Sequence, residues 1–276
     1  MTPNASKDLT VVILCKNEAD RLQRCVSSLK LANQLLVLDS YSDDESFERV
    51  RRSWETMGKA PEDLFFLARE WRGFTDARNY SLNLVQTPWV LWIDSDEWIE
   101  ADLERFLGST SLSELRGNVY RVARKSRYMG QWIRHGGWYP DRKARLGRVG
   151  FCEWRTGPRG ADVHEDLYPL GENESVGLLE GHIGHEPFRN LEEHFKTNDR
   201  YSTLLAMGLA KEYSQGVRHP YSRGLVMIKV LVKFVENYVW KLGVLDGRAG
   251  FRIAWGSAQS LYWRLNKAKQ FFLGAA

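Results

Sequence analysis

Trp89-Val90-Leu91-Trp92-Ile93-Asp94-Ser95-Asp96-Glu97 is an apolar run that follows Pro88 and ends in two aspartates one residue apart. Branched and aromatic residues bounded by proline predict a buried strand. Its C-terminal end would carry both carboxylates, at the edge where open α/β sheets bind ligands. Paired carboxylates can hold Mg²⁺ or Mn²⁺ together with substrate phosphates, so the run predicts metal-assisted chemistry on a phosphorylated donor. Exposed turns and helix caps contain the same Asp-x-Asp tripeptide, so the rest of the sequence must show whether it is a metal site here.

Strand and helix patterns alternate through the N-terminal part of the chain. We expect strands over residues 9–14, 35–38, 64–67 and 89–93, and helices over residues 19–31 and 76–85. Leu22, Val26 and Leu29 share one face of the first helix. Strands separated by helices predict parallel crossovers and a sheet covered on both faces, which is an α/β fold.

Polar residues follow three of these expected strands. They are Asn17 and Glu18 after the first, Asp39 and Ser40 after the second, and Asp94 and Asp96 after the fourth. Parallel topology would bring them to one crevice that could hold a base, a ribose and a diphosphate. Asp39 could instead cap a helix, and Asn17 could instead make a turn.

Composition and length limit the classes of protein. The chain has 276 residues, of which 43% are hydrophobic, enough for a large core. Residues 1–8 are short and polar, without the pattern of a secretion signal, so we expect a cytoplasmic protein. Cys15, Cys25 and Cys152 are odd in number and lack zinc-like spacing, which favours reduced structural thiols.

Charge is divided unevenly along the chain. Residues 217–276 contain ten Lys or Arg and two acidic residues, a formal charge of +8, and the rest of the chain carries −4. This asymmetry indicates a surface for anionic lipid, nucleic acid or an acidic substrate, or simply a solvated helical face. The basic part has no recognisable nucleic-acid motif, so we expect no nucleic-acid partner.

Several motifs together resemble a known family. They are Val12 to Glu18, Val37 to Asp44, Trp71-Arg72-Gly73-Phe74 with Ala77-Arg78-Asn79, Trp89 to Glu97, Trp138-Tyr139-Pro140-Asp141 with Arg145-Leu146, Val163-His164-Glu165, and Ile183-Gly184-His185. In this order and spacing they resemble the inverting glycosyltransferases of family 2, with the GT-A fold, and specifically the bacterial lipopolysaccharide-core β-glucosyltransferase branch. The resemblance covers residues 9–205. Asp-Ser-Asp-Glu stands here where the family more often has Asp-Ala-Asp-Glu.

The resemblance implies a mostly parallel, Rossmann-like sheet flanked by helices, with a C-terminal helical extension. Residues 1–115 would bind the nucleotide-sugar, residues 116–205 would bind the acceptor and carry the catalytic base, and residues 206–276 would form the extension. Nucleotide-binding residues carried over from the family are Asn17, Glu18, Asp39, Ser40, Arg78, Asn79 and Asp94. Metal ligands carried over are Asp96, Asp94 and His185, for Mg²⁺ or Mn²⁺. His185 could instead orient a metal-binding residue without binding the metal itself.

Transfer to an acceptor hydroxyl also needs a general base. Resemblance to the family's His-Glu step makes Glu165 our first choice and Asp166 the second, with Glu153 a more distant candidate. For the acceptor we expect contacts from Trp138, Tyr139 and Arg145, although core packing also explains tryptophan there.

The C-terminal segment differs from a plain transferase domain. Residues 224–242 are strongly apolar but contain Lys229, Lys233, Glu236 and Lys241, too many charges to span a bilayer comfortably. Such a helix could lie on the inner membrane surface, with tryptophans at headgroup level, or it could pack against the catalytic domain or a second subunit. Residues 246–251 resemble the branch's Asp-Gly-x-x-Gly-Phe element, whose role the sequence does not explain.

We therefore predict a metal-dependent inverting glycosyltransferase. UDP-glucose is the favoured donor, and a hydroxyl of the lipopolysaccharide core or another lipid-linked envelope glycan is the favoured acceptor. The alternatives are a non-catalytic nucleotide- or glycan-binding module and a sugar nucleotidylyltransferase. The last is disfavoured because residues 16–18 lack the glycine-rich basic loop expected there. The oligomeric state stays open.

Overall fold

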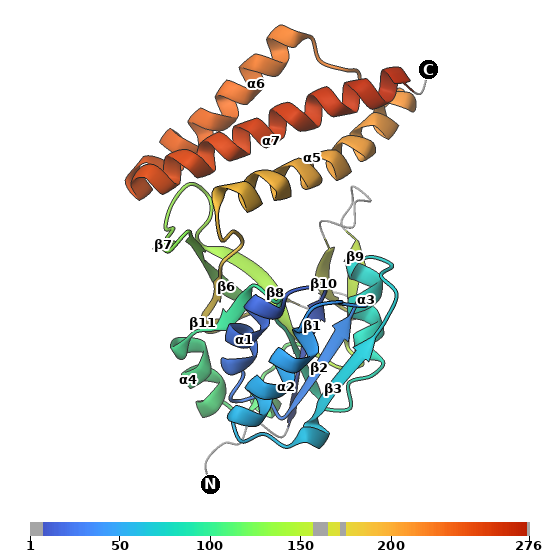
Figure 1. Cartoon of the computed structure of the whole chain (residues 1–276), viewed down its shortest axis with the longest axis vertical. Coiled ribbons are helices and arrows are strands. Elements are labelled where there is room, and N and C mark those ends of the chain that lie inside the picture. The colour runs from blue at the N-terminus through green and yellow to red at the C-terminus, as the bar shows by residue number, and fades with distance from the viewer. Residues whose placement is uncertain (1–7, 157–164, 172–174, 275–276) are drawn as a thin grey trace. The chain divides into compact units, whose positions relative to one another are not determined.

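The computed structural model describes residues 8–156, 165–171 and 175–274 (Figure 1). The described residues divide into two units. The first unit comprises residues 8–124, 142–156, 165–171 and 175–185, and the second comprises residues 125–141 and 186–274. The two units are defined by how compactly their residues pack. The functional division predicted above, into residues 1–115, 116–205 and 206–276, stays a prediction.

The N-terminal half of the first unit alternates strands and helices. Its elements are β1 (Leu9–Cys15), α1 (Ala19–Ser27), β2 (Gln34–Asp39), α2 (Ser46–Thr56), η2 (Pro61–Asp63), β3 (Leu64–Ala68), α3 (Phe74–Leu82) and β4 (Trp89–Trp92). β1 pairs in parallel with β2 and with β4, and β2 pairs in parallel with β3. The predicted strands and the parallel crossovers are therefore confirmed.

The remaining strands extend this sheet. They are β5 (Glu97–Ile99), β6 (Val119–Tyr128), β8 (Asp141–Arg148) and β11 (Gly177–His185), with α4 (Ala101–Ser109) and η3 (Leu112–Glu114) between β5 and β6. The strand order is β3-β2-β1-β4-β8-β6-β11-β5, with β8 antiparallel to β4 and β11 antiparallel to β5. β9 (Cys152–Thr156) and β10 (Glu165–Pro169) form a separate antiparallel pair. An α/β fold is thus confirmed.

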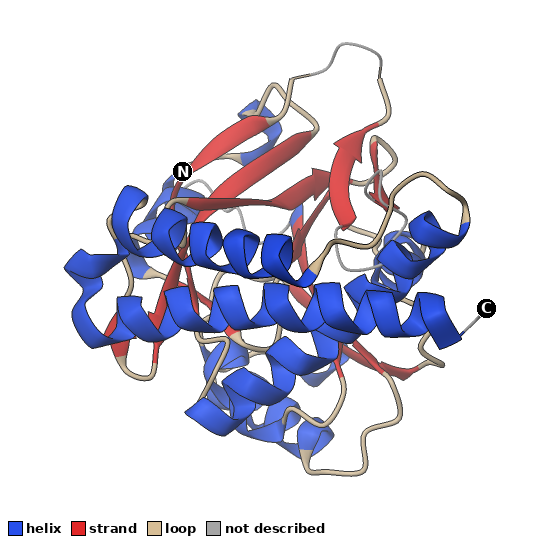
Figure 2. Cartoon of the chain, turned by 90° about the horizontal axis from the view of Figure 1, so that it is seen from above, coloured by secondary structure: helices blue, strands red, loops and turns tan. Residues whose placement is uncertain are grey.

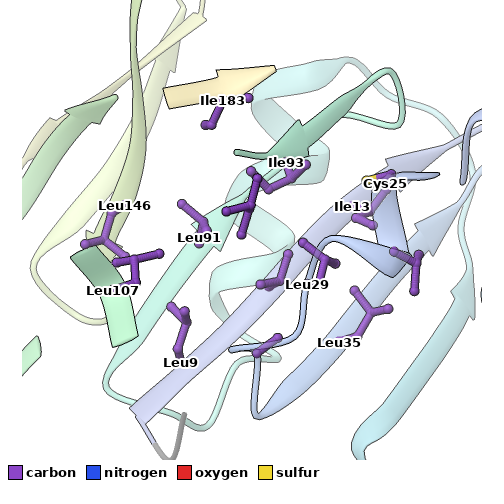
Figure 3. Packing of buried hydrophobic residues seen from close by; sticks show 14 of the residues in the cluster. Leu9, Ile13, Cys25, Leu29, Leu35, Leu91, Ile93, Leu107, Leu146 and Ile183 are labelled. Carbon is purple, nitrogen blue, oxygen red and sulfur yellow. The ribbon is translucent and has the colours of Figure 1, made fainter. Parts of the chain in front are cut away.

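Alternating side chains of the central strands bury both faces of the sheet. Leu9, Val11 and Ile13 of β1 join a cluster that also contains residues of α1, α2 and α4. Figure 3 shows 14 of this cluster's side chains, ten of them labelled, packed together around the strands. Val12 and Trp92 join a second cluster, on the opposite face, with Trp154 of the β9–β10 pair. Period-two alternation within wholly apolar strands is expected where both faces are covered.

Both predicted helices end earlier than expected, α3 at Leu82 where the prediction was residue 85. Residues 19–31 were predicted as helical, but α1 ends at Ser27. The backbone N–H groups of Ser28, Leu29 and Ala32 each bond to the carbonyl three residues earlier, so the chain continues as turns. Ser28 Oγ also accepts from Ile99 N at 3.0 Å, which ties this turn to β5.

The second unit is mainly helical. It contains the two-residue strand β7 (Gln131–Trp132), α5 (Leu191–Ser214), α6 (Arg223–Val235), η4 (Glu236–Trp240), η5 (Gly243–Asp246) and α7 (Gly247–Gly274). α5 and α7 lie side by side along their length, as both views show (Figure 2). Ala206 and Ala268 are fully buried between them, and small side chains at such positions let helices approach closely. The predicted C-terminal helical extension is confirmed, with its helices beginning at Leu191.

Among the residues that the structure describes, no helix is long and apolar enough to cross a membrane.

His194 is buried in the second unit and should make stability depend on pH. Its side chain stacks on Phe188, and Tyr128 Oη lies 2.8 Å from its Nδ1. Burial lowers the pKa of His194 to about 4, from an ordinary value of 6.5. As the pH falls through this interval the unfolded chain takes up a proton that the folded chain does not, so folding stability falls. It should fall by about 2–3 kcal/mol between about pH 7 and pH 4.

Urea denaturation of His194→Gln tests this prediction. The variant should be less stable than wild type at neutral pH but lose less stability on acidification. His219, which is exposed, offers the matched control, and His219→Gln should keep the wild-type pH dependence. Parallel pH curves for wild type and His194→Gln would contradict the prediction.

Candidate active site

The loops after β1 and β2 are joined to each other at the C-terminal edge of the sheet. Asn17 has a positive φ of 54°, and its backbone N–H donates to Ser42 Oγ at 2.8 Å. Its side-chain Oδ1 accepts from Asp43 N at 3.0 Å. Asp39 is buried and accepts from Ser42 N at 2.8 Å, as well as from the Ser42 hydroxyl. These bonds join the two loops into one rim of polar groups at the C-terminal edge of the sheet. The parallel sheet brings the two loops together at this edge.

Two further residues that were predicted to bind the nucleotide belong to this rim. Glu18 forms an ion pair with Arg21 on the next helical turn, at 3.2 Å. Ser40 N donates to Cys15 O at 2.9 Å, continuing the β1–β2 ladder by one bond. The structure thus brings Asn17, Glu18, Asp39 and Ser40 to one edge, and their contact with nucleotide stays a prediction.

Asp94 lies between two buried arginines directly after β4. Arg78 Nη2 donates to Asp94 Oδ1 at 2.8 Å, and Arg145 Nη2 donates to Oδ2 at 2.5 Å. Burial alone would raise the pKa of Asp94, but Arg145 and Arg78 together hold that pKa well below its usual value. Asp94 is therefore ionised, with each oxygen already accepting a charge-assisted hydrogen bond. Its assignment as a metal and nucleotide ligand stays a prediction, and metal binding would compete with these bonds.

Glu97 anchors the same turn from inside. Its side chain is fully buried, accepts from Arg145 at 2.5 Å and from Arg124 at 3.0 Å, and accepts from Asp94 N at 3.0 Å. A buried carboxylate is stable only with such compensation. Glu97 thus fixes the backbone that presents Asp94 and Asp96.

Asp96 is the carboxylate of this turn whose side chain reaches His185. Its Oδ2 lies 3.4 Å from His185 Nε2, and its side chain is 23% exposed. Burial would raise the pKa of Asp96, but His185 opposes this by its charge and its hydrogen bond, and the net pKa is lowered. His185 is opposite Glu97 in the β5–β11 register, which places it beside Asp96. The structure thus brings these two residues together, and their role as metal ligands stays a prediction.

Glu165 lies next to Arg78 at the start of β10. Its Oε1 is 3.5 Å from Arg78 Nε, and its side chain is 12% exposed. Burial raises the pKa of Glu165, and Arg78 lowers it by less. A carboxylate with a raised pKa is a stronger base than an exposed glutamate, which suits proton abstraction from a hydroxyl. Val163 and His164, the rest of this motif, lie outside the described residues.

Asp166, the alternative base, has a different environment. Its carboxylate forms a close ion pair with Arg121, and its Oδ1 accepts from Leu167 N at 3.1 Å. The ion pair with Arg121 and the bond from Leu167 N engage both carboxylate oxygens of Asp166. These contacts suit Glu165 better as the base, and the choice between the two residues stays a prediction.

Arg78 and Asn79 are adjacent on α3 but point to different partners. Asn79 Nδ2 donates to Trp154 O at 2.8 Å and its Oδ1 accepts from Trp154 N at 2.8 Å, so both polar groups join α3 to β9. The Arg78 guanidinium lies over the Trp154 ring at 4.3 Å. Within the described residues, Arg78 Nη1 and Arg145 Nε are buried without a hydrogen-bond partner. Unsatisfied cationic donors of this kind are suited to an anionic ligand.

The predicted acceptor residues fall into different units. Arg145 belongs to the Asp94–Glu97 network of the first unit. Trp138 and Tyr139 belong to the second, where Trp138 packs edge-on against Tyr128 at 5.9 Å and Tyr139 is 37% exposed. Their acceptor role stays a prediction.

Sequence reasoning missed several residues of this network. Arg121 and Arg124 both lie on β6, a strand to which the sequence analysis assigned no site residue. Glu97 was quoted as part of the motif, but no role was assigned to it. The sequence did offer one signal for these residues. Charged residues in a strand that otherwise buries apolar side chains indicate buried ion pairs.

Comparison with known sequences agrees with this geometry. A sequence model of the family described as Glycosyl transferase family 2 matches residues 10–158, more than half of the chain. The chain belongs to glycosyl transferase family 2. The matched residues include Asp39, Arg78 and the Asp94–Glu97 turn. The predicted family and enzyme class are thus confirmed, and the protein is a glycosyltransferase.

Individual relatives of this glycosyltransferase carry related names. The lipopolysaccharide core biosynthesis glycosyltransferase LpsC of Rhizobium meliloti (strain 1021) is 26% identical over 263 residues, which are 93% of this chain and 92% of LpsC. The SPbeta prophage-derived glycosyltransferase SunS of Bacillus subtilis (strain 168) is 27% identical over 200 residues, 66% of this chain and 41% of SunS. Among solved structures, mannosyltransferase PcManGT from Pyrobaculum calidifontis, in complex with GDP-Man and Mn²⁺, is 14% identical with a TM-score of 0.48, covering 99% of this chain and 76% of that one.

Proposed function

We propose that this glycosyltransferase moves a sugar from a nucleotide-sugar, with UDP-glucose the favoured donor, to a hydroxyl of the lipopolysaccharide core or a related lipid-linked envelope glycan. The observation that carries the proposal is the pairing of Asp96 with His185 beside the Asp94, Arg78 and Glu165 group. Similarity to LpsC over nearly the whole of both chains supports the acceptor class. The family assignment favours transfer over a non-catalytic binding module or a nucleotidylyltransferase.

The residues present fit a divalent metal that shares its ligands with the donor. Among the described residues, no group of three His, Cys, Asp or Glu side chains could enclose an ion alone. Asp96 and His185 supply two ligands, and Mg²⁺ commonly takes its others from substrate phosphates and water. The buried donors of Arg78 and Arg145 suit the charge of a diphosphate. A bound Mg²⁺ or Mn²⁺ would neutralise charge on the departing nucleoside diphosphate.

The chain's own residues then perform an in-line displacement. Asn17, Glu18, Asp39 and Ser40 would hold the nucleoside at the rim, and Arg78 would stabilise the diphosphate. Glu165 would take the proton of the acceptor hydroxyl as it attacks the anomeric carbon, so that the anomeric centre is inverted. Acceptor contacts by Trp138, Tyr139 and Arg145 are implied by the family resemblance alone. Alignment and charge stabilisation would supply most of the rate enhancement.

Calorimetric titration with UDP, GDP, CDP and ADP tests the donor site. In the presence of Mn²⁺ one nucleotide, UDP by our proposal, should bind at least about tenfold more tightly than the others, and EDTA should weaken its binding by a similar factor. The selected nucleotide's sugars can then be tested for transfer. Absence of binding to all four nucleotides would contradict the proposed donor site.

A further inference from the structure

The segment from α6 to η5 exposes apolar side chains that the described chain does not cover. Of the apolar residues on α6, only Val226 is buried, whereas Ile228 and Leu231 are 59% and 63% exposed. Trp240 of η4 and Leu245 of η5 are 68% and 64% exposed. Several large exposed apolar residues within one short segment indicate a surface that binds another molecule. We call these residues, Ile228, Leu231, Trp240 and Leu245, the apolar surface.

The charges near the apolar surface are cationic. Residues 217–276 contain only two acidic residues, Glu236 and Asp246. Glu236 forms ion pairs with Lys233 at 3.1 Å and with Lys241 at 2.5 Å. Asp246 is buried and accepts from His135 N at 2.8 Å. Arg218 and Lys267 pair with Glu212 and Asp199, which precede this segment in the chain. The segment keeps a formal excess of positive charge because it contains ten Lys or Arg and two acidic residues.

A cavity of about 370 Å³ opens at the start of α7. Tyr238, Gly247, Arg248, Phe251 and Arg252 line it. Among the described residues, neither Arg248 nor Arg252 has a carboxylate partner. The first turn of α7 adds the partial positive charge of its backbone N–H groups. The cavity is therefore suited to a phosphate group flanked by apolar material.

The Asp-Gly-x-x-Gly-Phe element builds this cavity. Asp246 accepts from the backbone N–H groups of Arg134 and His135, which fixes η5 before the first turn of α7. A Cβ on Gly250 would lie 1.8 Å from Gly243 O, so only glycine allows this close approach. Phe251 contributes one wall, with its ring 5.8 Å from that of Tyr238. This tight local packing indicates that the cavity is preformed.

We propose that the apolar surface and the Arg248–Arg252 cavity bind an anionic phospholipid bilayer. The apolar side chains would enter the interfacial region, and the two arginines would receive headgroup phosphates. Trp240 is suited to the headgroup level, where one side of the ring is apolar and the other wet. A second copy of the chain fits this surface less well, because it would bring two sets of cations together. The proposal rests on the second unit alone and does not depend on the donor site.

Flotation with lipid vesicles tests the charged part of the proposal. The full chain should float with vesicles of phosphatidylcholine and phosphatidylglycerol and much less with phosphatidylcholine alone. Arg248→Gln with Arg252→Gln should weaken binding roughly 10- to 30-fold, since each basic residue near an anionic surface contributes about a factor of five. The matched control removes the same charge from exposed arginines of the first unit, Arg52→Gln with Arg105→Gln, and should bind as wild type.

A second pair of variants tests the apolar part. Leu231→Ser should reduce flotation about tenfold, whereas Leu178→Ser, at a comparably exposed leucine of β11, should leave it unchanged. Circular dichroism would show that all variants fold. Sedimentation without vesicles tests whether a second copy of the chain binds the apolar surface instead. The proposal would be overturned if the wild type formed a dimer that Leu231→Ser dissociates and did not float with vesicles. Equal flotation with both vesicle types, or binding of inorganic phosphate alone, would overturn it as well. Nucleotide binding by the same samples reports separately on the donor site.

Discussion

Asp96→Asn should lower kcat by about 10³-fold while the protein keeps its fold. The Asp96 carboxylate is partly exposed, and its ion pair with His185 spans 3.4 Å, so its loss should change the free energy of unfolding by no more than about 1 kcal/mol. Loss of a group that stabilises charge in the transition state costs several kcal/mol of activation free energy. The effect should therefore appear in turnover and metal-dependent nucleotide binding, measured by transfer assay and calorimetry, and not in thermal unfolding.

Asp102 provides a matched control for Asp96. It also pairs with a histidine, His182, whose Nδ1 lies 2.6 Å from Asp102 Oδ2, and its side-chain exposure of 33% is similar. This pair lies at the start of α4 and not at the C-terminal edge of the parallel strands. Asp102→Asn should therefore keep most of the activity. Near-normal turnover by Asp96→Asn, or equal losses in the two variants, would contradict the metal-site proposal.

Glu165→Gln should lower kcat by about 10²- to 10⁴-fold with little change in nucleotide affinity. Glutamine keeps the size of the side chain and a hydrogen-bonding oxygen near Arg78, but it cannot accept the hydroxyl proton. Burial raises the pKa of Glu165, so the wild-type rate should fall on the acid side at a higher pH than an exposed glutamate would give. We call this fall of kcat at acid pH the acid limb, and it should disappear in the variant. The measurement is kcat against pH for both proteins.

Asp166→Asn separates the two candidate bases. Asp166 is paired with Arg121, so its substitution should cost much less turnover than Glu165→Gln and should keep the acid limb. If Asp166→Asn instead removed the acid limb and Glu165→Gln kept normal turnover, Asp166 would be the base. Thermal unfolding of both variants would exclude a loss of fold as the cause.

The N-terminal half of the fold could be predicted from sequence because its signals are local. Apolar runs such as residues 9–14 and 89–93 are short, rich in branched residues and separated by amphipathic helices. The end of α1 was less predictable, because Ser28 turns the chain through its bond to Ile99, which is 71 residues away in sequence. The family resemblance implied the helical extension of the second unit, but it did not show which helices pack against each other.

The site was predictable in part for the same reason. Carboxylates at strand ends are visible in the sequence, so Asp39, Asp94 and Asp96 were found. Their electrostatic environment was not visible, because the cations come from distant elements. Arg124 and Arg145 each lie in strands far along the chain from the turn whose carboxylates they bind.

The sequence by itself determined the α/β class, the parallel direction of the first strands and the presence of carboxylates at one edge of the sheet. It could do so because hydrophobic periodicity and turn residues act locally. Only the tertiary structure decided the surroundings of each carboxylate. Arginines occupy both oxygens of Asp94, Glu97 is buried among cations, and the antiparallel register of β5 and β11 places His185 beside Asp96. Burial and ion pairing set pKa values and determine which carboxylate oxygens are available to a ligand. Both depend on residues that come together only when the strands assemble into the sheet.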